Sequence, residues 1–400
     1  MQCTQKKRIL FIGSDDGTMR AIEAADRLGY QTVAVDSTPD SAAVAAAQEG
    51  VAALMSDPAE IARVARAAGI HGIYPSLEPA ASAAAAELNL PGLPPDAAIL
   101  MHDKYALRQA LSGSGVSQPT FCAAAEEAEA MAAAETVRLP VVVKPIRGRG
   151  SKGVRRVDHL ADVSLAFAQA KRAAPDGVVL VESFVEGRHV TVDGAVQCGS
   201  FRPISAHGSL SAAPPCCYDE AVYAPLENEL LSGLASAAGA LAKALKITGG
   251  VFSAEFICSA NAFFLVELHP YPSHLVLPAD LLALTAGITT AEAVLRACTG
   301  EPLPANPVLP GSNRSAAIYW IPTHSGFVTA IEGLEYARAV PGVCEVRVTA
   351  KPGDQMGHVV DVAARDRVGY AIAAGNSAGE ALDAAREAAG RCSIVTSQAL

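Results

Sequence analysis

The first hundred residues alternate short apolar segments with helix-forming segments, and this alternation constrains the fold more than any other feature of the chain. Arg8–Gly13 and Gln31–Val35 are apolar runs typical of buried strands, and a further strand starts at Gly72–Tyr74. Thr18–Leu28 and Pro58–Ala68 between them are typical of helices. Strands that alternate with helices over short connections form a parallel sheet with helices on both faces. We therefore expect a doubly wound α/β unit at the N-terminus.

The rest of the chain mixes predicted strands and helices without regular alternation, which indicates an α+β body and a smaller C-terminal unit. After a Pro/Gly-rich break at Pro91–Pro95 we expect a helical stretch from about Asp96 to Leu111, and later a long helix at Glu227–Leu245. Four prolines in Pro302–Pro310 predict a linker. The expected units are 1–102, 103–310 with a subdomain at about 118–185, and 311–400. Further predicted strands are Leu139–Lys144, Val178–Glu182, His189–Val192, Gly250–Cys258, Ala262–Leu268, Ala316–Ile321 and Glu345–Thr349, and Ser377–Ala389 is a predicted helix.

The composition excludes several classes of function. Half of the 400 residues are hydrophobic, so the chain can bury a large core, and a net charge of −10 without basic clusters disfavours nucleic-acid binding. No apolar run reaches the roughly 18–20 residues of a membrane span, and Ile9–Ile12 is too short for the core of a signal peptide. We therefore expect a cytoplasmic protein with no nucleic-acid or membrane partner.

A glycine-rich loop, Arg147–Gly153, lies between two predicted strands and is a candidate phosphate site. Its glycines Gly148, Gly150 and Gly153 allow backbone N–H groups to approach phosphate oxygens without a Cβ clash. Lys144, three residues before the loop, can place an ammonium group on the same phosphates. The sequence is not a Walker A motif, because no GK[ST] opens a helix here. The alternative is a flexible hairpin tip with no ligand.

Two glutamates on consecutive predicted strands form a candidate metal site. If the turn between the strands centres on Asn261, Glu255 and Glu267 lie directly opposite each other, with Cβ atoms about 4.5–5.5 Å apart. Two like charges so placed are destabilising unless a cation lies between them, and Mg²⁺ commonly uses one or two carboxylates plus substrate phosphates. His269 lies two residues beyond Glu267 and therefore on the same face. The alternative is a solvent-facing pair in a slipped register.

The strand Val178–Glu182 runs into the segment Glu182–Val185, which we consider a candidate adenine site. A strand that stops there offers unpaired backbone N–H and C=O groups to the edge of a planar base. The alternative is an ordinary sheet strand that leads into a tight turn.

In this order the motifs resemble the ATP-grasp superfamily, and the resemblance spans nearly the whole chain. Residues 72–92 and 103–121 resemble the hinge into the body of carboxylate–amine ligases. Residues from about 315 to the end resemble the C-terminal cap of biotin carboxylase-like and L-amino-acid ligase-like members. The resemblance implies an ATP-grasp fold with an N-terminal pre-ATP-grasp unit and a C-terminal cap. Its motifs are Asp103-Lys104, Val143-Lys144-Pro145, the loop Arg147–Gly153, Glu182-Ser-Phe-Val185-Glu-Gly187, Ala254-Glu255-Phe256 and Val266-Glu267-Leu268-His269-Pro270.

The resemblance also implies roles for matching residues. Lys104 and Lys144 would hold the phosphates of ATP under the glycine-rich loop, and Glu182 and Val185 would meet adenine through backbone groups. His189 stands where many members have a ribose-binding glutamate. Glu255 and Glu267 would bind magnesium, with His269 as a third candidate ligand. The implied ATP-binding residues are Lys104, Lys144, Gly148, Gly150, Ser151, Gly153, Glu182, Phe184, Val185 and His189.

Two positions depart from the family pattern, which is Glu-x-Asn-Pro-Arg where this chain has Glu267-Leu-His269-Pro-Tyr271. A histidine in place of asparagine offers a nitrogen ligand to a metal that prefers oxygen, so His269 binds metal weakly, prefers Mn²⁺ or only orients phosphate. Tyr271 removes an arginine charge that would stabilise the acyl-phosphate or its transition state. The candidates to replace that charge are Arg149, Arg202 and Arg314, and we take Lys144, Arg149 and Arg314 as the catalytic set.

The leading functional hypothesis is an ADP-forming ligase that activates a small carboxylate as an acyl-phosphate and joins it to an amine, with ATP and Mg²⁺ or Mn²⁺ as cofactors. His207, Glu220 and Tyr271 are the candidate substrate residues, although Glu220 also fits a surface turn. A homodimer is possible, because dimers are common in the resembled family.

Three alternatives remain open at this point. The pair Arg188-His189 and the cap suggest a biotin carboxylase-like or purine-biosynthetic carboxylase. The altered Asn-Pro-Arg motif suggests a nucleotide-binding protein without ligation. Gly13-Ser-Asp-Asp-Gly17, followed by Asp36, suggests a dinucleotide-binding oxidoreductase, but it lacks the GxGxxG pattern.

Overall fold

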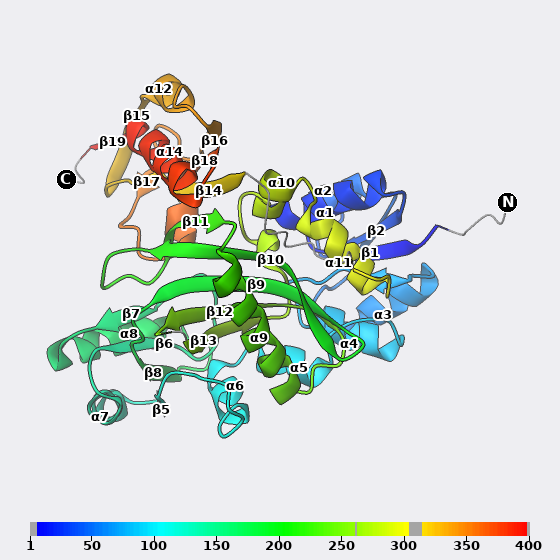
Figure 1. Cartoon of the computed structure of the whole chain (residues 1–400), viewed down its shortest axis with the longest axis horizontal. Coiled ribbons are helices and arrows are strands. Elements are labelled where there is room, and N and C mark those ends of the chain that lie inside the picture. The colour runs from blue at the N-terminus through cyan, green and yellow to red at the C-terminus, as the bar shows by residue number, and fades with distance from the viewer. Residues whose placement is uncertain (1–5, 261, 304–313, 398–400) are drawn as a thin grey trace.

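The computed structural model describes residues 6–260, 262–303 and 314–397, and within them β-sheets form the frame of the molecule (Figure 1). There are four sheets, with the strand orders β3-β2-β1-β4, β5-β8-β6-β7, β13-β12-β9-β10-β11-β14-β18-β16 and β17-β15-β19. The mixture of one parallel sheet with antiparallel sheets confirms the predicted combination of α/β and α+β. Within the described residues no helix is both long and apolar enough to cross a membrane.

The N-terminal sheet is parallel, as predicted, and helices cover both of its faces. Ile9 and Phe11 of β1 pack on α1, whereas the alternate residues Leu10 and Ile12 pack on α3 and α4. Because both faces of β1 are buried, its sequence is a continuous apolar run. The elements are β1 (Arg8–Ile12), α1 (Asp16–Arg27), β2 (Gln31–Asp36), α2 (Ala42–Ala46), β3 (Glu49–Ala52), α3 (Pro58–Ala67), β4 (Gly72–Ile73) and α4 (Ala80–Glu87).

The helical stretch expected from about Asp96 to Leu111 is present, and it is divided into two helices. They are α5 (Pro95–Leu100) and α6 (Lys104–Ala110). The side chain of Asp103 accepts a hydrogen bond from the backbone N–H of Ala106 and so starts a new helix. The break puts Lys104 in the first turn of α6, where its backbone N–H donates to the carbonyl of Ile146.

The central sheet has eight strands, and its last three belong to the part of the chain that we expected to form a separate cap. Strand β14 pairs with β11 from Ala221↔Tyr319 to Ala224↔Ala316, so the sheet passes without interruption into the C-terminal residues. Residues 304–310 of the expected linker Pro302–Pro310 lie outside the described residues. The strands are β9 (Arg188–Gln197), β10 (Ser200–Ser211), β11 (Asp219–Ala224), β12 (Gly250–Ser259), β13 (Ala262–His269), β14 (Ser315–Trp320), β16 (Val343–Val348) and β18 (Gly369–Gly375).

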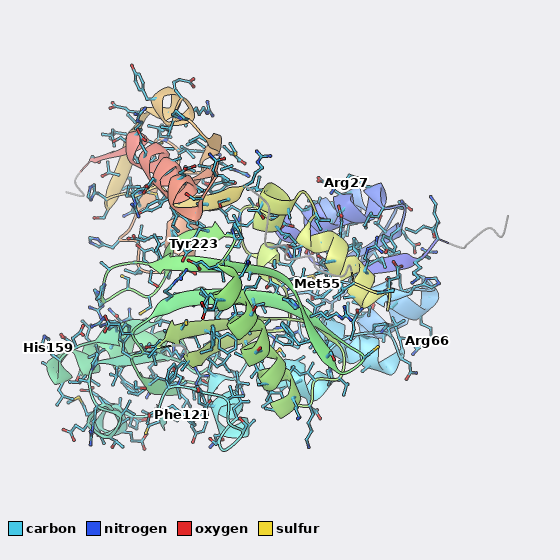
Figure 2. The ribbon with its side chains drawn as sticks, in the orientation of Figure 1. Arg27, Met55, Arg66, Phe121, His159 and Tyr223 are labelled. Atoms are coloured by element: carbon cyan, nitrogen blue, oxygen red, sulfur yellow. The ribbon has the colours of Figure 1, made fainter. Side chains whose placement is uncertain are left out.

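A second antiparallel sheet lies beside the central one and carries the glycine-rich loop. Phe121 and His159 mark this unit in Figure 2. Its helices α7 and α8 pack on the sheet in one apolar cluster. The elements are β5 (Phe121–Ala124), α7 (Glu127–Val137), β6 (Val141–Pro145), β7 (Arg155–Val157), η1 (Leu160–Asp162), α8 (Val163–Ala173) and β8 (Val179–Ser183).

The remaining helices cover the central sheet, and a small third sheet completes the C-terminal part. Helix α9 packs on one face of the central sheet, and α14 packs on β14 and β18. The helices are α9 (Asn228–Ala244), η2 (Ser273–Leu275), α10 (Leu281–Ala286), α11 (Thr290–Cys298), α12 (Leu334–Arg338), α13 (Val362–Asp366) and α14 (Ala378–Arg391). The small sheet contains β15 (Gly326–Glu332), β17 (Gln355–Met356) and β19 (Ser393–Ser397).

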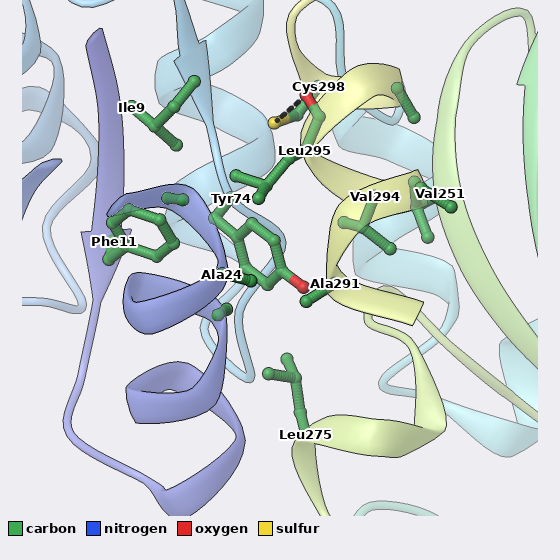
Figure 3. Packing of buried hydrophobic residues seen from close by; sticks show 14 of the residues in the cluster. Ile9, Phe11, Ala24, Tyr74, Val251, Leu275, Ala291, Val294, Leu295 and Cys298 are labelled. Carbon is green, nitrogen blue, oxygen red and sulfur yellow. Dashed lines mark hydrogen bonds between the residues drawn. The ribbon is translucent and has the colours of Figure 1, made fainter. Parts of the chain in front are cut away.

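One apolar cluster joins the N-terminal sheet to the body of the molecule (Figure 3). Tyr74 lies at its centre, stacked on Phe11 with ring centroids 5.3 Å apart, and its hydroxyl is 2.9 Å from Nε2 of His274. Helix α11 packs against α1 across this cluster. Helix α11 packs on α1 across the expected boundary at 102, and β14 pairs with β11 across the expected boundary at 310. The three-unit division of the chain therefore stays a prediction.

Gly17 in the first turn of α1 allows this close approach. A Cβ atom added to Gly17 would lie 2.3 Å from Cα of Leu275, which is far inside van der Waals contact. We expect Gly17→Ala to lower the free energy of unfolding by about 1–3 kcal/mol, because the backbone of η2 must shift to accept the methyl group. Urea denaturation followed by circular dichroism measures the change.

Gly390→Ala is the matched control for this prediction. Gly390 also lies in a helix, α14, and a Cβ atom added there would meet nothing within 4 Å. This change should raise the free energy of unfolding by about 0.5–1 kcal/mol, because alanine loses less conformational entropy in a helix. Equal stability of the two variants would contradict a close contact at Gly17.

Candidate active site

The two candidate metal carboxylates lie directly opposite each other in the β12–β13 hairpin, as predicted. The register pairs Glu255 with Glu267. The register is not regular, as the sequence prediction assumed. A β-bulge between Glu255 and Phe256 leaves Val266 without a partner in β12. Nη2 of Arg108 donates to the carbonyl of Val266 at 2.8 Å, so the bulge is held by a buried cation.

Glu255, Glu267 and His269 form a group that fits a divalent cation. One ligand atom from each lies within 4.8 Å of the others. Burial opposes the charge on both carboxyl groups, but His189 and His269 hold the pKa of Glu255 well below its usual value, and Lys104 and His269 lower that of Glu267. Two ionised carboxylates suit Mg²⁺, whereas the imidazole of His269 is a poorer ligand for it.

Lys104 connects this carboxylate group to the glycine-rich loop. Its Nζ lies 2.5 Å from Oε1 of Glu267 and donates to the carbonyl of Gly148 at 2.9 Å. The neighbouring Asp103, which caps α6, accepts a hydrogen bond from Nη2 of Arg147 at 3.0 Å. The motif Asp103-Lys104 and the loop are therefore brought together although more than forty residues separate them.

Lys144 lies beside the buried carboxylate of Glu182, a residue whose backbone groups were expected to meet adenine. Its Nζ is 2.5 Å from Oε2 of Glu182, and the other oxygen, Oε1, accepts a hydrogen bond from Nε of Arg108 at 2.7 Å. All three side chains are almost fully buried. Burial opposes the charge on Glu182, but the two cations outweigh it and lower its pKa, so the carboxylate is ionised.

Arg108 was missed by the sequence reasoning. It lies on α6 four residues after Lys104, and this spacing puts both side chains on one face of the helix. The signal was therefore present, but an arginine in a short helix is usually exposed, and only the fold shows that Arg108 has no exposed surface.

The segment expected to bind adenine offers fewer free backbone groups than predicted. The N–H of Phe184 donates to the carbonyl of Pro140 at 2.9 Å, and that of Ser183 donates to Thr120. The guanidinium carbon of Arg156 lies 4.1 Å from the centre of the Phe184 ring. Within the described residues, Val185 is the first residue of this segment outside β8 whose N–H has no backbone partner.

His189 connects the carboxylate group to β11. Its Nδ1 lies 3.4 Å from Oδ1 of Asp219, and its Nε2 lies 3.4 Å from Oε2 of Glu255 without the alignment of a hydrogen bond. Burial favours neutral imidazole, but the two carboxylates outweigh it and raise the pKa of His189 to about 10. A protonated His189 explains how Glu255 stays ionised beside Glu267 in a buried place.

Alternate residues of β9 present a polar row to the same face as the two glutamates. Thr191 is registered between Glu255 on β12 and His207 on β10, and Asp193 accepts hydrogen bonds from Ser205 and Ser273. We did not single out Thr191 or Asp193 in the sequence. The polar/apolar alternation His189-Val-Thr-Val-Asp193 was the signal that could have found them, because successive strand residues point to opposite faces.

His207 ends this row and faces a small cavity. It is only 6% exposed, has no hydrogen-bond partner among the described residues, and burial lowers its pKa. The cavity has a volume of about 30 Å³ and is also lined by Ser273, His274 and Asp280. A buried imidazole with unpaired nitrogens beside a cavity is suited to bind a polar group of a ligand.

The glycine-rich loop is held from two sides. The carbonyl of Gly150 accepts a hydrogen bond from the N–H of Val362 at 3.0 Å, and the hydroxyl of Ser151 donates to the carbonyl of Cys217 at 2.9 Å. Gly153 packs so tightly on α8 that an added Cβ would lie 2.8 Å from Cβ of Ala173. The loop therefore closes against the C-terminal residues, which no local sequence pattern indicated.

Arg149 lies next to Tyr271. The tyrosine is buried, and its ring stacks on that of His269 with centroids 5.2 Å apart. Burial raises the pKa of Tyr271, and the positive charge of Arg149 opposes that rise. The guanidinium group of Arg149 therefore acts at Tyr271, the position where this chain lacks the arginine of the family pattern.

The remaining candidates are Glu220, Arg202 and Arg314. Glu220 is half-buried on β11, and in the described part of the chain no hydrogen bond or ion pair connects it to the lysines or to the metal carboxylates. Arg314 is exposed directly before β14, and Arg202 is exposed on β10. Their roles stay predictions.

Comparison with sequence profiles finds two matches. The profile described as an ATP-grasp domain matches residues 101–272, which contain both lysines, the loop and the two glutamates. The profile described as L-amino acid ligase C-terminal domain 2 matches residues 318–397.

Comparison with curated proteins finds relatives along the whole chain. A formate-dependent phosphoribosylglycinamide formyltransferase from Nitratidesulfovibrio vulgaris is 30% identical over 401 aligned positions, which cover 96% of this chain and 95% of that protein. An uncharacterised protein from Sinorhizobium fredii is 28% identical over 296 residues, and the match covers 71% of this chain but only 59% of that protein's length.

The fold comparison agrees with the sequence comparisons. The crystal structure of an L-amino acid ligase from Bacillus licheniformis superimposes with a TM-score of 0.78 at 21% identity and covers 99% of this chain and all of that one. Together with the full-length relative at 30% identity, these matches show that the chain belongs to the ATP-grasp family and is an ATP-dependent enzyme of the ADP-forming ligase class.

Proposed function

We propose that this enzyme activates a small carboxylate with ATP as an acyl-phosphate and joins the acyl group to an amine. The observation that carries the proposal is the position of Lys104, whose ammonium group contacts both the glycine-rich loop at Gly148 and the carboxylate of Glu267. One cation thereby connects a loop suited to phosphate with a pair of carboxylates suited to magnesium, as phosphoryl transfer requires.

The first step forms the acyl-phosphate. A carboxylate oxygen attacks the γ-phosphorus of ATP, the bond to the β–γ bridging oxygen breaks, and ADP leaves with that electron pair. Lys104, Lys144 and the N–H groups of the loop bind the phosphate oxygens and hold the reactants in line. Glu255 and Glu267 would hold Mg²⁺, which when bound neutralises charge on the phosphates. The loop over the site excludes water from the acyl-phosphate.

The second step transfers the acyl group. The amine nitrogen attacks the acyl carbon, phosphate leaves with the bonding electrons, and the nitrogen loses a proton. We assign Arg149 to the charge that develops on the acyl oxygen and the phosphate, because its positive charge acts on Tyr271, whose ring stacks on that of His269. It takes the place of the arginine that the family pattern would put at position 271.

We assign the binding site of the amine substrate to the end of the polar row, at His207. No lysine or arginine lines the cavity that His207 faces, Asp280 lines it too, and the negative charges that act on this histidine are those of Asp193, Asp219 and Glu255. An acidic environment with a neutral imidazole favours an amine over a second anion. We assign the adenine site to the backbone from Val185 onward, because Val185 is the first described residue after β8 whose N–H has no backbone partner.

The relatives indicate which carboxylates to test first. The full-length relative is named as a formate-dependent transferase, and the structural relative as an L-amino acid ligase. Formate and the L-amino acids are therefore the first carboxylates in a screen for release of ADP and phosphate, crossed with primary amines and amino acids. Stimulation by one carboxylate–amine pair supports ligation. Stimulation by bicarbonate without an amine would instead indicate a carboxylase, and ADP release that no pair stimulates would contradict ligation.

We expect Lys144→Ala to abolish ATP turnover. The change removes a cation from the phosphate site and leaves the buried carboxylate of Glu182 with Arg108 alone. Coupled measurement of ADP release gives the rate, and we expect a loss of at least about 100-fold, by analogy with removal of one preorganised stabilising group from a transition state.

Lys171→Ala is the matched control, because Lys171 is a lysine of the same sheet-and-helix unit. It is half-buried on α8, and its Nζ contacts the carbonyl of Ala125, the carboxylate of Glu126 and the ring of Phe167, none of which belongs to the proposed site. Its removal should leave ADP release unchanged. Normal turnover in Lys144→Ala would contradict the proposed phosphate site, and circular dichroism of both variants distinguishes lost function from lost folding.

We expect His269→Asn to keep ATP turnover and to lower the Mg²⁺ concentration needed for half-maximal rate. An amide oxygen is a better ligand than an imidazole nitrogen for a hard cation. Titration of the wild type and the variant with Mg²⁺ and with Mn²⁺ tests this, since the variant should lose the relative preference for Mn²⁺ that we expect of the wild type. An inactive but folded variant would show that His269 acts through its contacts with Glu255 or Tyr271 and not as a replaceable ligand.

A further inference from the structure

Arg108 is a buried cation that has no role in the steps of the proposed reaction. It has no exposed surface, its Nε donates to Oε1 of Glu182 at 2.7 Å, and its Nη2 donates to the carbonyl of Val266 at 2.8 Å. Its third nitrogen, Nη1, is buried and has no hydrogen-bond partner among the described residues. Arginine is almost never fully buried unless it is paired, and here Arg108 shares its carboxylate with Lys144.

The group formed by Arg108, Lys144 and Glu182 carries more positive than negative charge. Both oxygens of Glu182 are occupied, because Oε2 lies 2.5 Å from Nζ of Lys144 while Oε1 binds Arg108. Lys104, a further cation whose charge acts on Lys144, has its own carboxylate partner in Glu267 and does not change this balance. An unmatched buried charge is costly, so the excess disfavours folding unless an anion balances it.

Lys144 is the member of this group that can offer the excess charge to a ligand. It lies near the end of β6, three residues before the glycine-rich loop, whereas Arg108 points its nitrogens at Glu182 and at the bulge of β13. Burial lowers the pKa of Lys144, Glu182 opposes this fall, and the charges of Arg108 and Lys104 add to it. An anion beside Lys144 would therefore stabilise the ammonium group and balance the whole group.

We propose that Arg108 is a positioning residue for ATP, because it neutralises Glu182 and so keeps the charge of Lys144 available to a phosphate group. This role rests on the proposed contact of Lys144 with the phosphates. Without Arg108, Glu182 and Lys144 would form a neutral pair, and the carboxylate would repel the phosphates that the ammonium group attracts. Arg108 also holds one oxygen of Glu182, so that only the other oxygen is left for Lys144.

The test is the affinity for a non-hydrolysable ATP analogue with an imido bridge, measured with Mg²⁺ by isothermal titration calorimetry. No carboxylate or amine is added, so the result does not depend on ligation. We expect Arg108→Met to raise the dissociation constant of the analogue at least about tenfold, because its phosphates then meet a neutral pair. Adenosine, which has no phosphates, should bind the wild type and the variant alike.

The double variant Arg108→Met with Glu182→Gln separates charge compensation from a purely structural role. It removes the carboxylate together with the guanidinium group, so Lys144 again carries an unmatched charge and most of the lost affinity should return. If Arg108 only held the fold together, the second change would not restore binding. Arg108→Lys keeps the charge without the fork of the guanidinium group and should lose less affinity than Arg108→Met.

Arg63→Met is the matched control, because Arg63 also pairs with a glutamate, Glu60, at 2.6 Å, but on the exposed surface of α3. Its removal should leave the affinity unchanged. Circular dichroism monitors the folding of every variant. If Arg108→Met does not fold, the double variant decides the question, since binding close to that of the wild type supports the role and weak binding overturns it.

Three results would overturn the role of Arg108. They are unchanged analogue affinity in Arg108→Met, an equal loss of adenosine and analogue affinity in that variant, and a folded double variant without recovery. Failure of the proposed function would be seen differently. Analogue binding by Lys144→Ala as tight as that of the wild type would contradict the phosphate site itself, whereas tight binding by a wild type that joins no carboxylate to an amine would contradict ligation alone.

Discussion

The buried carboxylate of Glu182 is the constraint on which the rest of the site depends. It lies between Lys144 and Arg108 with almost no exposed surface. A buried charge is costly unless it is paired, and removing one partner of such a group typically costs about 3–5 kcal/mol. Because its two cations come from β6 and α6 and Arg108 also binds the bulge of β13, this one group fixes the loop strand, the body and the metal hairpin relative to each other.

The charges around the metal hairpin alternate in sign, and this alternation keeps them ionised. Lys104 lies against Glu267, His269 against Glu255, and His189 between Glu255 and Asp219. Each carboxylate has a cation as neighbour, so two glutamates that face each other can both be charged before any ligand arrives. The polar face of the central sheet provides the places for these groups, because every second residue of its strands points to that face.

Parts of this arrangement could be predicted because they depend on local periodicity. Opposite positions in a hairpin follow from its strand limits, and so Glu255 and Glu267 were expected to face each other. The bulge at Val266 could not be predicted, since it is held by a hydrogen bond from Arg108, which is 158 positions away in the sequence. The contact of Gly150 with Val362, the pairing of Asp219 with His189 and the continuation of the central sheet into β14 depend likewise on contacts between distant segments.

The sequence by itself determined the strand–helix alternation of the N-terminal unit, the family, and the lysines, glutamates and glycine-rich loop of the site, because periodicity and short motifs are local properties. Only the tertiary structure decided which charges are paired. It assigned Glu182 to Lys144 and Arg108 rather than to a free strand end, and split the helix before Lys104. The physical reason is that pairing and burial depend on distance in space, and residues far apart in the chain become neighbours only when the sheets have formed.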